Sequence, residues 1–320
     1  MSKFLGIRLS VATSSLGKTA AGYHIRQKLR AARAQGFDGV EVAFDCLEGH
    51  ALLEPFASED SRASRLLAAA QDIYTLASAE SLEIIALTPF GAYDALEHPD
   101  DVQDRLQEAE LWLQICEKLR APILQVPTFI PPTNKKTTSN INKIADNMRR
   151  LGQLARSYNK IIAYEGVAWG IYTDKWQQIR DIIELVNLPN VRHCLDTFHI
   201  AACLAGDPFN ASAPVRPEGL IELGKSLEEL RQTLDPNTIG YFQLSDATVA
   251  DPDQRGYANP DLSQPPFMVQ SRNCRIYPCE PEHGGALPAV DVAKAVFDTG
   301  YRGWVSMEVF HTDLWKYGEE

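Results

Sequence analysis

The sequence predicts an α/β fold, a (β/α)8 barrel that spans residues 1–320 as a single domain. Two observations predict it. Short apolar runs alternate along the chain with longer amphipathic stretches, and there are eight of these runs. Short continuous apolar runs are typical of strands that are buried on both faces of a parallel sheet. Eight strands with helices between them favour a closed barrel over an open sheet.

The strand candidates are apolar runs bounded by turn-forming or charged residues. They lie at 5–11, 39–44, 83–88, 123–127, 161–165, 191–196, 239–245 and 304–310. The helical candidates between them have apolar residues near a helical period, as in 61–81, where the series is Leu66, Ala69, Ala70, Ile73 and Leu76. They lie at 24–35, 61–81, 101–119, 140–158, 176–186, 218–233 and 290–298.

Two features depart from a plain barrel. A long, proline-rich connection at 246–287 follows the seventh strand candidate, and long insertions of this kind are often functional lids. Only ten residues follow position 310. We therefore expect the eighth helix to be short or missing.

The composition excludes several classes of protein. Apolar residues make up 45% and charged residues 23% of the chain, which is an ordinary globular balance. The net charge of −11 disfavours binding to nucleic acid, because phosphate contacts require clustered Lys and Arg. We find no membrane-spanning or targeting segment. None of the six cysteines forms a CxxC pair, so we expect free thiols and a cytoplasmic location. The sequence does not decide whether the protein forms a homo-oligomer.

Polar side chains end four consecutive strand candidates. Glu165 and Asp196 end the fifth and sixth, and Gln243 and Glu308 lie near the ends of the seventh and eighth. Barrel active sites lie at the carboxyl ends of the strands, so we expect these oxygen atoms to converge. Converging carboxylates favour a hard divalent cation, such as Mg2+ or Mn2+. The alternative is that each acid caps the following helix, and that Gln243 only makes hydrogen bonds inside the barrel.

Three more residues are candidates for an active site at the same end of the barrel. His199 follows Asp196 by three residues and suits proton transfer, although it could simply hydrogen-bond a neighbour. Arg272 lies in the long connection and suits a carboxylate, although it could be a surface charge. Tyr93 follows the third strand candidate and either lines the pocket or is a partly buried loop residue. We find no glycine-rich phosphate loop and no serine-hydrolase motif.

Longer stretches of the sequence resemble a known family. They are 164–170 (YEGVAWG), 194–200 (CLDTFHI), 242–247 (FQLSDA), 271–275 (SRNCR) and 303–310 (GWVSMEVF). They are similar to the xylose-isomerase-like TIM barrel superfamily and, within it, to the 3-dehydroshikimate dehydratases of quinate and shikimate breakdown. The strand-seven glutamine and the SRNCR stretch point most narrowly to the dehydratases. Shorter matches at 15–17 and 36–41 extend the resemblance over almost the whole chain.

The resemblance implies a lyase that dehydrates 3-dehydroshikimate, a carboxylated cyclic compound, to protocatechuate. It implies that Glu165, Asp196, Gln243 and Glu308 bind a divalent metal (Mg2+, Mn2+ or Co2+), and that His199 transfers protons. The dehydratases place a histidine two residues after a tryptophan-glycine pair, where this sequence has Tyr172, and we expect Tyr172 to contact the substrate.

The alternative hypothesis is a divalent-metal keto-sugar isomerase or epimerase that acts through an enediolate. Glu165 and Glu308 would then be paired bases on opposite faces of the substrate, which makes Glu165 a second catalytic candidate beside His199.

Overall fold

The computed structural model describes residues 6–53, 55–58, 61–130, 134–251 and 264–316. Eight parallel strands close into a barrel in the order β1-β10-β7-β6-β5-β4-β3-β2. These strands are β1 (Arg8–Ala12), β2 (Gly39–Ala43), β3 (Glu83–Thr88), β4 (Ile123–Pro127), β5 (Ile161–Glu165), β6 (Val191–Asp196), β7 (Ile239–Leu244) and β10 (Trp304–Met307). The predicted (β/α)8 barrel is therefore confirmed.

The strand boundaries differ from the prediction mainly at the first and last strands. β1 begins at Arg8 rather than at residue 5. β10 ends at Met307 rather than at residue 310. Beyond it, the Val309 amide donates to the Ser15 hydroxyl at 2.8 Å, and the Phe310 carbonyl accepts from the Arg275 amide at 2.9 Å. The chain leaves the sheet because its backbone groups find partners outside it. Glu308 is thereby placed at the rim of the barrel.

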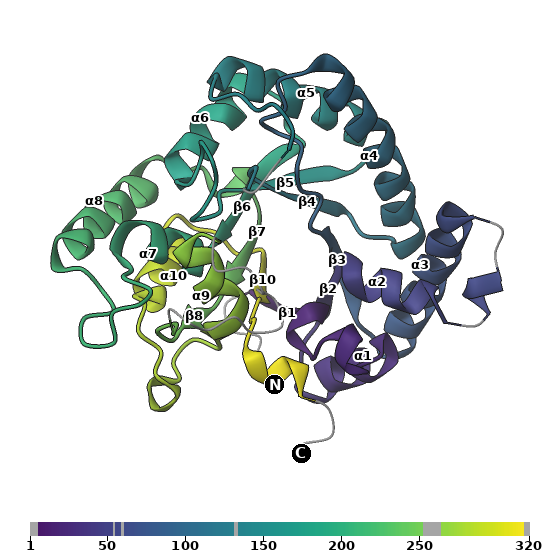
Figure 1. Cartoon of the computed structure of the whole chain (residues 1–320), viewed down its shortest axis with the longest axis horizontal. Helices are drawn as coiled ribbons and strands as arrows, with labels where there is room; N and C mark the ends of the chain where they lie inside the picture. The colour runs from purple at the N-terminus through teal and green to yellow at the C-terminus, as the bar shows by residue number, and fades with distance from the viewer. Residues whose placement is uncertain (1–5, 54, 59–60, 131–133, 252–263, 317–320) are drawn as a thin grey trace.

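Helices surround the strands on the outside of the barrel (Figure 1). All seven predicted helices are present, with ends that differ by no more than two residues. They are α1 (Ile25–Ala34), α3 (Arg62–Ala79), α4 (Pro99–Leu119), α5 (Ile141–Ser157), α6 (Trp176–Val186), α8 (Pro217–Thr233) and α10 (Ala289–Asp298). None of the described helices is long and apolar enough to cross a membrane.

The prediction missed three short helices, which are α2 (Phe44–Ala51), α7 (Thr197–Ala205) and α9 (Pro266–Cys274). α2 and α7 start directly at strand ends, with no intervening turn residues to mark a boundary. In α7 the last residue of β6, Asp196, is also the N-cap, and its side chain accepts from the His199 amide at 3.1 Å. The strand end and the following helix therefore orient these two side chains together.

The long connection after β7 forms structure of its own. β8 (Asp246–Ala247) pairs with β9 (Arg275–Ile276) in an antiparallel ribbon, and α9 contacts α7 (Figure 1). Residues 252–263 of the predicted connection lie outside the described residues. After β10, the described helical element is a single 3-10 turn, η6 (Thr312–Trp315), as expected for a short eighth helix.

Candidate metal and active site

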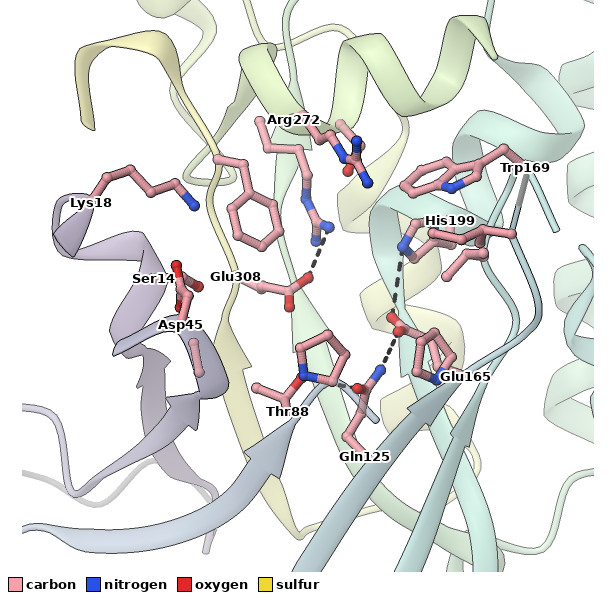
Figure 2. A pocket seen from close by; sticks show the side chains of 18 residues that line it. Ser14, Lys18, Asp45, Thr88, Gln125, Glu165, Trp169, His199, Arg272 and Glu308 are labelled. Carbon is pink, nitrogen blue, oxygen red and sulfur yellow. Dashed lines mark hydrogen bonds and ion pairs between the residues drawn. The ribbon is translucent and has the colours of Figure 1, made fainter. Parts of the chain in front are cut away.

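The carboxyl ends of the strands surround a cavity of about 400 Å³ (Figure 2). That volume suits a small cyclic metabolite. The barrel supplies Gln125 from β4 and Glu165 from β5, and α7 supplies His199. The loop after β1 supplies Lys18, and α9 supplies Arg272.

Three side chains could hold a metal ion: Glu165 and His199 line the cavity, and Asp196 is buried beside them. Glu165, Asp196 and His199 each offer one ligand atom, and these atoms all lie within 4.8 Å of one another. His199 Nδ1 accepts from the Ala168 amide at 3.1 Å, so the neutral ring carries its proton on Nε2. Nε2 lies 3.7 Å from Glu165 Oε1. This geometry suits His199 for proton exchange as much as for metal binding.

The donor set fits a divalent cation. Glu165 Oε1 is buried and has no hydrogen-bond partner, while Gln125 donates to Oε2. Burial and the charges of Glu308 and Asp196 raise the pKa of Glu165 well above its usual range. Burial raises the pKa of Glu308 to about 8. A bound cation would relieve both the desolvation and the repulsion of these carboxylates.

Gln243 lies in the layer below. Its Nε2 donates to Glu41 Oε2 at 3.1 Å and to Glu308 Oε1 at 3.0 Å, while its Oε1 accepts from Cys194 Sγ at 3.3 Å. The amide therefore contacts one predicted metal ligand, with its nitrogen toward the carboxylates. Burial raises the pKa of Glu41 to about 7.

Arg275, for which the sequence predicted no role, also belongs to the site. This fully buried guanidinium pairs with Asp196 at 2.5 Å and with Glu308 at 2.8 Å, and it donates to Ser245 Oγ at 2.8 Å. It thereby compensates part of the charge of two predicted metal ligands. The available signal in the sequence was its place in the SRNCR stretch at 271–275, which carries the family resemblance.

Arg272 lies in the wall of the cavity, and its Nη1 donates to Gln264 Oε1 at 3.1 Å. Trp169 lies in the same wall, and its ring packs edge-on against His199 with 5.0 Å between ring centroids. Figure 2 shows Trp169 and His199 on one side of the cavity and Lys18, Ser14 and Asp45 on the other.

The two predicted tyrosines lie elsewhere. Tyr93 is fully buried, and its hydroxyl donates to the Asn147 carbonyl at 2.7 Å. The prediction that it binds substrate is wrong, because the residue belongs to the core behind the strands. Tyr172 is half-buried, packs against the same core and shares a 2.9 Å hydrogen bond with Thr137, and it does not line the described cavity.

Tyr93→Phe tests this correction. We expect the free energy of unfolding to fall by about 1 kcal/mol, because a buried hydrogen bond is lost, with the catalytic rate unchanged. Denaturant unfolding and a rate assay measure the two quantities. A large rise in KM without loss of stability would return Tyr93 to the substrate site.

The chain matches the family model of the xylose isomerase-like TIM barrel over residues 29–320. The chain belongs to this family. It is also 32% identical, over 320 aligned residues, to the 3-dehydroshikimate dehydratase of Neurospora crassa, a match that covers 98% of this chain and 89% of that protein. At this identity and coverage, the chain groups with the 3-dehydroshikimate dehydratases of the xylose isomerase-like family.

A more distant relative is the 3-dehydroshikimate dehydratase of Pseudomonas aeruginosa, which is 26% identical over 94% of this chain. The chain spans 38% of the length of that protein. The relationship is therefore to one part of the Pseudomonas protein.

Solved structures share the fold. A fusion of a xylose isomerase-like TIM barrel with 4-hydroxyphenylpyruvate dioxygenase superimposes with a TM-score of 0.69 at 22% identity, covering 95% of this chain and 39% of that one. The IolI protein, whose crystal structure holds a zinc atom, superimposes with a TM-score of 0.67 at 17% identity, covering 97% and 91% of the two chains. At these identities, the neighbours support the barrel alone.

Proposed function

We propose that this protein is a metal-dependent hydro-lyase that dehydrates 3-dehydroshikimate to protocatechuate. The observation that carries the proposal is the 32% identity, over nearly the full length of both chains, to the Neurospora crassa dehydratase. The cavity supports it with buried carboxylates, a buried histidine and a cation in its wall. These are the groups that an elimination from a carboxylated cyclic ketone requires.

Glu165, Asp196, Gln243 and Glu308 would hold the divalent metal, which we expect to be Mg2+, Mn2+ or Co2+. The unpartnered Glu165 Oε1 and the excess of carboxylates over guanidinium groups support this assignment. When bound, such a cation supplies Lewis-acid polarisation of the substrate ketone, which acidifies the neighbouring C–H. Gln243 would turn its oxygen toward the cation and release Glu308.

His199 and Glu165 would together move that proton. Burial lowers the pKa of His199 to about 4, so the ring is uncharged near neutral pH and its Nε2–H lies beside Glu165 Oε1, which would accept the proton. The Ala168 amide holds Nδ1 and the Asp196 side chain holds the His199 backbone, so both the ring and its helix are fixed. Glu165 is the second catalytic candidate, because its Oε1 lies 3.7 Å from the same Nε2.

Arg272→Ala is expected to weaken binding of the carboxylated ring by about 10- to 100-fold, because a charge-assisted pair to the substrate carboxylate would be lost. A neutral keto-sugar should lose almost nothing. Titration calorimetry with both compounds measures the difference. Equal losses for the two compounds would favour the keto-sugar isomerase over the dehydratase.

The alternative function is a divalent-metal isomerase or epimerase of a keto-sugar. The carboxylates of Glu165 and Glu308, both at the cavity, would serve as its paired bases. Turnover in D2O separates the two reactions. The dehydratase makes an aromatic product and no epimer, whereas the isomerase returns a proton from solvent and places deuterium beside the ketone.

The cytoplasmic location stays a prediction. Oligomerisation stays open.

A further inference from the structure

Lys18 lines the cavity, although the sequence predicted no role for it. It lies in the wall opposite His199 and Trp169, and Figure 2 shows its side chain directed toward the cavity centre. Its ammonium lies 4.9 Å from the centroid of the Phe310 ring. Phe310 also lines the cavity, two residues after Glu308.

Backbone contacts around Lys18 hold its side chain at the cavity. Its backbone amide donates to the Leu314 carbonyl at 2.8 Å, which ties the loop after β1 to η6. Gly17 adopts a left-handed conformation (φ 95°), and a Cβ at this position would lie 2.4 Å from the Tyr23 ring. The tight turn therefore requires glycine, and it directs the next side chain inward.

The charge of Lys18 is only partly compensated. The charged and titratable groups near it are Asp45 and Cys46 of α2, Lys28 of α1 and Glu308. Among the described carboxylates, none forms an ion pair with it within 4.0 Å. Burial lowers the pKa of Lys18, which makes its proton easier to release.

The dehydration needs an acid as well as a base. Proton removal beside the ketone is assigned to His199 and Glu165, but hydroxide is a poor leaving group and must be protonated as it departs. Among the cavity residues, Arg272 and Arg275 hold their protons too tightly to act as acids, and Glu165 and Glu308 are the proposed metal ligands. Lys18 carries transferable protons and faces the cavity, and it is assigned neither to proton removal nor to metal binding.

We propose that Lys18 is the general acid that protonates the departing hydroxyl group, an inference that rests on the dehydratase function proposed above. The C–O bond breaks as Nζ gives its proton to the oxygen, and water leaves. The neutral amine then accepts the ring proton that is lost when the product becomes aromatic. The proton first removed beside the ketone passes from the base to the former ketone oxygen, which becomes a phenol hydroxyl. Lys18 and the base thus return to their starting states, and the net change is loss of one water.

Two variants and two substrates test this role. Lys18→Met removes the acid, and Lys18→Arg keeps the charge without a releasable proton. With 3-dehydroshikimate, kcat of both variants should fall by about 10²–10⁴-fold, the usual contribution of a general acid. With an analogue that carries chloride in place of the departing hydroxyl, both variants should react within about threefold of the wild-type rate, because chloride leaves without a proton.

Lys225→Met, an exposed lysine of α8, is the matched control and should react normally with both substrates. Thermal melting checks that each variant is folded. Wild-type kcat in Lys18→Arg would overturn the proposal, because charge alone would then suffice. An equal loss with the chloride analogue would also overturn it. If the wild-type protein forms no aromatic product, the dehydratase function itself fails, and the acid role fails with it.

Discussion

Glu165→Gln is expected to lower metal affinity by at least about 100-fold and to abolish dehydration, while the barrel stays folded. Replacing residues that only hydrogen-bond to metal ligands lowers metal affinity or activity by about 10–100-fold, and Glu165 is itself a proposed ligand. The carboxylate of Glu165, whose buried Oε1 has no hydrogen-bond partner, would be replaced by a neutral amide. The amide has lower affinity for a hard cation. Elemental analysis after dialysis, together with the rate, measures both effects.

Asp94→Asn is the matched control for this experiment. Asp94 is as buried as Glu165 but accepts from the Tyr164 hydroxyl at 2.6 Å, and it does not line the cavity. It should keep its metal and most of its activity. Full metal occupancy in Glu165→Gln, with the control unchanged, would show that Glu165 is not a ligand.

His199→Ala is expected to lower kcat by about 10²–10⁴-fold, the usual contribution of a general acid or base, with bound metal retained. The ring is placed by the Ala168 amide and by Trp169, so its loss removes a group already aligned for proton transfer. The measurement is kcat together with metal content. His50→Ala, which removes a histidine paired with Asp72 at 2.9 Å outside the cavity, is the control.

The two readouts separate the roles of His199. A wild-type rate in His199→Ala would remove the residue from the mechanism. Loss of metal together with loss of rate would make it a ligand, as its position within 4.8 Å of the atoms of Glu165 and Asp196 allows.

Much of the barrel could be predicted because each strand occurs in the sequence as a short apolar run. The polar residue that ends each run then lies at one rim, since parallel strands have their carboxyl ends on the same side. That rule brings Glu165, Asp196 and Glu308 to the same region, and the Arg275 contacts to Asp196 and Glu308 show two of them converging.

The rest of the site depends on tertiary contacts that local patterns do not encode. Tyr93 follows β3 as a pocket residue could, but the Asn147 carbonyl of α5 accepts its hydroxyl hydrogen bond and keeps it in the core. Arg275 occurs in the long connection, far in sequence from its partner Asp196. Lys18 is held at the cavity by the hydrogen bond that its backbone amide donates to the Leu314 carbonyl.

The central claim is that this barrel uses a bound divalent metal to turn 3-dehydroshikimate into protocatechuate. The most direct measurement is the absorbance of protocatechuate formed from 3-dehydroshikimate by the protein after chelation, and again after Mn2+, Mg2+ or Co2+ is added back. We expect no product from the chelated protein and restored turnover with at least one of these metals. Full activity of the chelated protein would contradict the metal requirement, and no protocatechuate under any of these conditions would contradict the dehydratase function.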